Sequence, residues 1–158
     1  MCILCAAVWL PAGCGSASGL DAAIADYADA QITVAGLTET EFTISPSELA
    51  ELDCVSSSAS GQTAKAGTVS AAGPTLETFL EQYGKTQTDF ALARFIASDG
   101  YRVTLHIQSL EKYEIILSVA SGDKPLPESE RPLRLLIPGA ESSQWIYAVE
   151  RIEFEAKK

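Results

Sequence analysis

The apolar runs of this chain are short, and turn-forming residues separate them. Most runs alternate apolar with polar positions, a pattern typical of half-buried β-strands. We expect about nine strands of this kind, in ITVAGL, EFTIS, the two ends of CVSSSASGQTAKAGTVSA, FALARFIA, YRVTLHI, YEIILSVA, RPLRLLI and WIYAVERIEFE. The dipeptide Asp99-Gly100 suits the positive φ angles of a tight hairpin turn. Neighbouring strands are therefore expected to pair mostly antiparallel.

Two segments have helix signals instead. SPSELAEL begins with a serine that can cap, a proline at the first helical position and a glutamate that completes a capping box, which predicts a helix over 46–52. GPTLETFLEQYG places its apolar residues at helical spacing, with Thr75 as a cap and Gly84 to end the helix. The fold class expected for 29–158 is a mixed, mostly antiparallel, β-rich α+β domain with two or so short helices.

The N-terminus has a different composition, MCILCAAVWLPAGCGSASG. Its apolar run is shorter than the roughly 20 residues needed to span a bilayer and suits the core of a secretory signal. LPAGCGS resembles the lipobox of bacterial lipoproteins, in which the cysteine, here Cys14, is acylated. We expect a signal over 1–14, a flexible tether over 15–28 and an extracytoplasmic, membrane-anchored protein.

Two features depart from the lipoprotein pattern. Pro11 stands where leucine is usual, and no Lys or Arg precedes Ile3, as if the start codon were placed too late or the sequence trimmed. The alternatives are a cleaved signal or an apolar N-terminal strand. The CxxC of Cys2 and Cys5 lies inside the apolar segment, so we expect no metal site there. Cys54 would remain alone, with no partner for an intrachain disulfide.

The charge balance excludes one class of ligand. The chain has 21 acidic and 11 basic residues, for a net charge of −10. Such a surface repels phosphate backbones, so no nucleic acid partner is expected.

The order of the motifs is more informative than any one of them. ITVAGL, SPSELAEL, GPTLETFLEQYG, SDGYRVTL, DKPLPESERPLRLLIPG and RIEF together resemble the oxidoreductase molybdopterin-binding domain of the sulfite oxidase family, in its small single-domain form, over 31–156. The resemblance implies a β-rich fold around a molybdenum-carrying pterin. It also implies a cysteine thiolate on the metal and basic side chains on the cofactor's phosphate, which suits the cost of burying unpaired charge.

The matching positions of this chain carry other residues. The family's cysteine position falls near Ser60 or Gly61, whereas Cys54 stands at the start of its strand. Cys54 is then a small buried strand residue, with a metal thiolate or an exposed redox thiol as alternatives. The family's basic positions fall on Gln144 and Tyr147 when the chains are aligned on Pro138-Gly139 and Arg151.

The loop AESSQWIY is therefore expected to keep the shape of a site without its positive charge. Its candidate pocket residues are Ser142, Ser143, Gln144 and Tyr147, and Glu141 adds negative charge that would repel a phosphate. Trp145 and Tyr147 are either core residues or part of a surface for a ligand or partner.

Other polar residues suggest no chemistry. His106 has no second histidine for a zinc site and is expected on the surface. The serines of 56–60 lack the G-x-S-x-G context of a hydrolase. The carboxylates Asp123, Glu128 and Glu130 are expected to be solvated charge.

These observations favour a catalytically degenerate, membrane-anchored member of the molybdopterin-binding fold. We expect it to act as a binding or interaction module for a protein partner or small ligand, with no cofactor. The alternative is a working molybdenum oxidoreductase with Cys54 as metal ligand and backbone N–H groups on the pterin. An unrelated small α+β lipoprotein is the third possibility.

Overall fold

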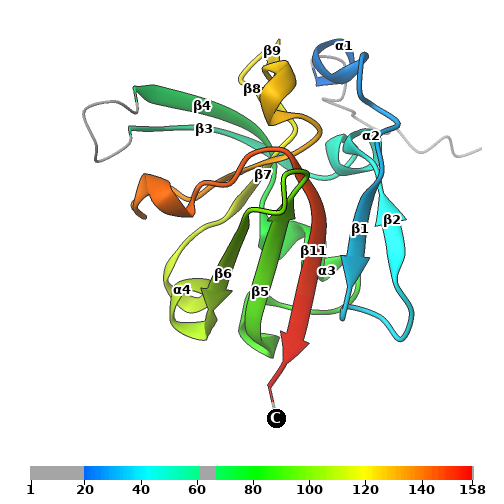
Figure 1. The fold of residues 1–158 in the computed structure, drawn as a ribbon, viewed down its shortest axis with the longest axis vertical. Helices are drawn as coiled ribbons and strands as arrows, with labels where there is room; N and C mark the ends of the chain where they lie inside the picture. The colour runs from blue at the N-terminus through cyan, green and yellow to red at the C-terminus, as the bar shows by residue number, and fades with distance from the viewer. Residues whose placement is uncertain (1–19, 61–66, 158) are drawn as a thin grey trace, which may run out of the picture.

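The computed structural model describes residues 20–60 and 67–157. Its largest sheet has five strands in the order β2-β1-β11-β5-β6. Their bounds are β1 (Ile32–Ala35), β2 (Phe42–Ile44), β5 (Phe90–Ala97), β6 (Arg102–His106) and β11 (Val149–Ala156). β1 and β11 are parallel, and the other neighbours are antiparallel. The C-terminal strand therefore lies in the middle of the sheet, between the first strand and the β5–β6 hairpin (Figure 1).

The remaining strands of the described residues form two smaller sheets. One has the order β3-β4-β8-β9 and the other pairs β10 with β7. Their bounds are β3 (Cys54–Ser60), β4 (Thr68–Pro74), β7 (Ile116–Ser118), β8 (Ala120–Ser121), β9 (Lys124–Pro125) and β10 (Arg134–Leu136). Figure 1 shows β3 and β4 as a long hairpin that extends away from the five-stranded sheet. All pairs within the smaller sheets are antiparallel.

Short helices connect the strands. The α-helices are α1 (Leu20–Ile24), α2 (Pro46–Ala50), α3 (Leu76–Glu81) and α4 (Ile107–Lys112), and three single 3-10 turns are η2 (Gln87–Asp89), η3 (Glu128–Glu130) and η4 (Ser142–Gln144). None of the helices in the described part of the chain is long and apolar enough to span a bilayer. The predicted fold class, a mixed and mostly antiparallel α+β domain, is confirmed.

Both predicted helix starts are present. The hydroxyl of Ser45 accepts a hydrogen bond from the backbone N–H of Glu48 at 3.2 Å, and the Glu48 carboxylate accepts one from the Ser45 N–H at 2.8 Å. This reciprocal pair satisfies two backbone donors that the helix itself cannot use. Thr75 caps α3 by accepting from the N–H of Thr78. Gly84, which follows α3, has a φ of 65°, as a glycine after a helix commonly does.

The structure differs from the sequence expectation at three places in the chain. The run YRVTLHI does bury Val103 and Leu105, but a helix, α4, begins at Ile107 and buries Leu110. β8 and β9 are two-residue strands: Ala120 ends the run YEIILSVA, which was expected to be a strand, and Ser121, Lys124 and Pro125 lie beyond it. The last strand begins at Val149, so 145–148 lie outside it.

The segment expected to be a tether is, from Leu20 onward, part of the folded domain. Ile24 is 1% exposed and Tyr27 is 8% exposed. The Tyr27 hydroxyl donates a hydrogen bond to the carbonyl of Val119 at 2.7 Å and accepts one from the N–H of Leu126 at 2.9 Å. The composition of this segment, with its many alanines, gave no sign that Ile24 and Tyr27 are core residues. The lipobox residue Cys14 lies outside the described residues.

We expect the substitution Tyr27→Phe to lower the free energy of unfolding by about 1–3 kcal/mol, because it leaves the buried Leu126 N–H and Val119 carbonyl without a partner. Urea denaturation measures this loss. Tyr83→Phe is the matched control, since the Tyr83 hydroxyl makes no hydrogen bond to the described residues and the ring is 36% exposed. Equal stabilities for the two variants would show that the two hydrogen bonds of the Tyr27 hydroxyl do not stabilise the domain.

Candidate functional site

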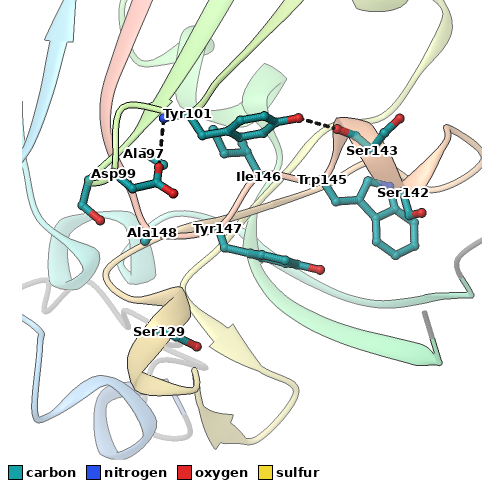
Figure 2. A pocket seen from close by; sticks show the side chains of 11 residues that line it. Ala97, Asp99, Tyr101, Ser129, Ser142, Ser143, Trp145, Ile146, Tyr147 and Ala148 are labelled. Atoms are coloured by element: carbon teal, nitrogen blue, oxygen red, sulfur yellow. Dashed lines mark hydrogen bonds between the residues drawn. The ribbon is translucent and has the colours of Figure 1, made fainter. Parts of the chain in front are cut away.

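A pocket of about 470 Å³ opens at one end of the five-stranded sheet. Its walls come from three segments far apart in sequence: the β5–β6 turn (97–101), Ser129 in η3, and 142–148 ahead of β11 (Figure 2). Three of the predicted pocket residues, Ser142, Ser143 and Tyr147, line it. Gln144 does not. The Asp99-Gly100 turn, expected only as a hairpin connection, forms part of the wall.

The apolar part of the 142–148 loop holds it in place. Trp145 is 4% exposed, and its indole N–H donates to the carbonyl of Ile137 at 3.0 Å. The carbonyl of Ile146 accepts from the N–H of Leu135 in β10 at 2.8 Å. Gly139, with a φ of 82°, supplies the turn after Pro138 that returns the chain toward the sheet. Trp145 is therefore a core residue that also forms one wall of the pocket.

Backbone hydrogen bonds join the three walls to one another. Ala148 has a φ of 51°, in the left-handed region that alanine rarely adopts. Its carbonyl accepts from the N–H of Ser98 in the β5–β6 turn, and its N–H donates to the carbonyl of Glu130 in η3. Such strain persists where the surroundings determine it, and it is concentrated at functional sites. The pocket is thus formed by a segment that the fold holds in a sparsely populated conformation.

Two tyrosines line the open part of the pocket. Tyr101 is 54% exposed and Tyr147 is 41% exposed. The Tyr101 hydroxyl approaches the carbonyl of Ser143 at 3.4 Å, and its backbone N–H donates to Oδ1 of Asp99 at 2.9 Å, as the dashed lines of Figure 2 show. This hydrogen bond within the β5–β6 turn orients the side chain of Asp99.

Asp99 is the one charged side chain among the described residues that line the pocket. Two arginines of the sheet, Arg94 and Arg151, have a carboxylate partner away from the pocket, whereas Arg102 of β6 is exposed and pairs with no carboxylate among the described residues. Arg94 and Arg151 both pair with Glu153, at 2.8 and 2.7 Å, on the outer face of β11. Hydrogen bonds from these two guanidinium groups lower the pKa of Glu153. Lys65 and Lys158 lie outside the described residues.

One cation is buried close to the pocket wall without lining it. Arg134, 3% exposed, pairs with Glu130 at 2.7 Å and donates a second hydrogen bond to the carbonyl of Ser70. Glu130 is therefore an ion-pair partner rather than the solvated charge expected from the sequence. Among the described residues, two buried side-chain atoms have no hydrogen-bond partner there: Nε of Arg134 and Oε1 of Gln144. An orphaned acceptor such as Gln144 Oε1 suits a hydrogen-bond donor and not a phosphate oxygen.

Cys54 is the first residue of β3 and is half-buried. Its thiol lies 3.7 Å from the carbonyl oxygen of Leu49 and 3.8 Å from that of Ala50, as a donor to α2. Burial, with a smaller contribution from the charge of Asp53, raises the pKa of the Cys54 thiol. Cys54 does not line the pocket. Ser60, near the position that the resemblance implies for a cysteine, is exposed and hydrogen-bonded to Thr68, and Gly61 lies outside the described residues.

The residues described do not fit a phosphate-bearing molybdenum cofactor in this pocket. A buried phosphate needs Arg, Lys or several N–H donors, and the metal needs a thiolate. The described lining has no basic side chain and no sulfur, and its one charge is negative. Over the described residues no three of His, Cys, Asp and Glu gather as a metal site would require. The His106 side chain is exposed at the end of β6, as expected.

Comparison with known proteins agrees with the fold. The family model of the oxidoreductase molybdopterin binding domain matches residues 20–158. No curated protein matches the chain. Among solved structures, the sulfane dehydrogenase SoxCD from Paracoccus pantotrophus aligns with a TM-score of 0.65 at 16% identity, over 82% of this chain and 39% of that one. The chain thus spans about two fifths of the length of that relative. The resemblance predicted from the motifs is confirmed, and this chain belongs to the oxidoreductase molybdopterin-binding domain family.

Proposed function

We propose that this chain is a non-catalytic member of the family that binds a small ligand in the pocket formed by 97–101, Ser129 and 142–148. The observation that carries the proposal is the charge of the described lining, which has Asp99 and no basic side chain. A cofactor phosphate in that pocket would face a carboxylate without a counter-charge, and both would resist losing water.

The environment of Cys54 supports the same proposal. A metal-binding thiolate is favoured by nearby cations, helix N-termini or the metal itself. The Cys54 sulfur instead points at two carbonyl oxygens of α2, and its raised pKa keeps it protonated at neutral pH. Deprotonation would turn both hydrogen bonds into repulsive contacts. The position suits a structural thiol.

A second candidate is a working molybdenum oxidoreductase. Family membership favours it, as does the fold shared with a protein named a sulfane dehydrogenase. This candidate would require Cys54 to leave its contacts with α2 and act as metal ligand, and backbone N–H groups to replace basic side chains on the pterin phosphate.

Metal analysis distinguishes the two candidates. We expect the full chain, expressed in a bacterium that makes the molybdenum cofactor, to contain far less than one molybdenum per chain by mass spectrometry. A cofactor-loaded family member expressed in the same host is the positive control. The variants Cys54→Ser and Ser57→Ala, neighbours on β3, should be equally metal-free.

One molybdenum per chain, lost in Cys54→Ser and kept in Ser57→Ala, would overturn the non-catalytic proposal. Because Ser57 lies on the same strand, the comparison separates loss of a ligand from damage to β3.

We also propose that Cys14 anchors the protein to a membrane outside the cytoplasm. The support is the sequence LPAGCGS at the end of an apolar run. The protein would then be permanently attached to a bilayer, and the ligand site would lie in the extracytoplasmic space.

Radiolabelled palmitate tests the anchor. We expect label on the full chain and partition into a detergent phase, because acyl chains bury many methylene groups. Cys14→Ser should abolish both, whereas Cys5→Ser, a cysteine of the same apolar segment, should retain both. Label that survives in Cys14→Ser would contradict the assignment.

A further inference from the structure

We propose that the ligand of this pocket is an organic cation, an ammonium group with apolar substituents. The inference rests on the proposed function, since it names the class of molecule that the same site would hold. It is carried by three properties of the described residues: aromatic walls, a single negative charge, and backbone ties that hold the walls in place.

The aromatic walls are the first property. Tyr101 and Tyr147 are two of the three large hydrophobic side chains that stay exposed in the described chain, and both line this pocket. Figure 2 shows the ring of Tyr101 directed toward Ser143, the ring of Tyr147 on the other side of the Ile146 segment, and the indole of Trp145 near Ser142. None of the three pairs with another aromatic ring in the part of the chain that is described. The two tyrosines are thus exposed in the pocket lining and stack on no other ring of the described residues.

Aromatic faces attract cations as well as apolar groups. The negative face of the ring quadrupole stabilises an ammonium group within about 6 Å of the ring centroid, and several rings together recognise quaternary ammonium ligands. Anionic ligands receive the opposite contribution. The volume of about 470 Å³ is within the ordinary range for a small-molecule pocket.

The charge of the lining is the second property. Asp99 Oδ1 accepts from the backbone N–H of Tyr101, which orients the carboxylate within the β5–β6 turn. Its other oxygen has no hydrogen bond to the described residues and can face a ligand. The net charge of −10 draws cations toward the whole surface. A neutral ligand of the same shape would gain the ring contacts but not the attraction to Asp99.

The third property is that the walls are already in place. Ala148, between Tyr147 and β11, is bonded through its carbonyl to Ser98 and through its N–H to Glu130. These bonds join the turn that carries Asp99 and Tyr101 to the loop that carries Trp145 and Tyr147. A site formed before binding does not lose free energy in ordering its walls.

A matched pair of probes tests the inference. Choline and 3,3-dimethyl-1-butanol have nearly the same shape and differ in charge. We expect choline to bind the full chain at least about tenfold more tightly, measured by NMR titration of the backbone amides of 97–101 and 142–148. Choline affinity should also fall as salt is raised, because Asp99 is exposed.

Variants locate the contacts. Asp99→Asn should lower choline affinity several-fold and leave the affinity for the neutral probe unchanged. Tyr147→Ala should weaken both probes, choline by roughly tenfold. Glu155→Gln and Tyr83→Ala, an exposed carboxylate and an exposed ring outside the pocket lining, are the matched controls and should bind as the unmodified chain does.

The outcomes separate the inference from the function on which it rests. Equal affinity for the two probes at this pocket would overturn the cation assignment and leave the binding function in place. Absence of shifts with either probe would also overturn the cation assignment. One molybdenum per chain, in the metal analysis described above, would overturn the binding function itself.

Discussion

The hydrogen bonding of β11 to both β1 and β5 is the constraint on which the other features depend. It places the C-terminal strand at the centre of the sheet, in parallel register with β1 and antiparallel to β5. The segment that enters β11 must therefore pass the end of the β5–β6 hairpin. Ala148 takes its left-handed conformation at this crossing, where it bonds to both Ser98 and Glu130. The pocket therefore forms where the segment 142–148 leads into β11 beside the β5–β6 turn.

The distribution of charge follows the same architecture. On β5 and β11, Arg94 and Arg151 pair with Glu153, while Arg134 is neutralised by Glu130 inside the fold. A buried guanidinium without a carboxylate partner would be very costly, so Glu130 and Arg134 act as a unit. The described pocket lining therefore contains one carboxylate, that of Asp99, and the aromatic side chains of Tyr101, Trp145 and Tyr147. In this chain the family fold thus carries a pocket whose described lining lacks the basic side chains that a phosphate would need.

Much of the fold could be predicted from local patterns. Ser45 and Glu48, the alternation of Ile152 and Phe154, and the order of the motifs all refer to neighbours close in sequence or to a known family. The packing of Tyr27 could not, because its partners at Val119 and Leu126 are about 90 or more residues away. Of the candidate pocket residues, Ser142, Ser143 and Tyr147 line the pocket and Gln144 does not. Asp99 and Tyr101 were missed as site residues, since only the register of β5, β6 and β11 brings their turn to that loop.

The position of α1 limits the distance between a lipid at Cys14 and the folded domain. The first helix, α1, begins at Leu20, which is six positions after Cys14 (20 − 14 = 6). Even fully extended, such a span reaches only about 20 Å. A lipid at Cys14 would therefore keep the negatively charged domain close to the lipid headgroups. Ligands would then reach the domain from the layer of solvent next to the membrane.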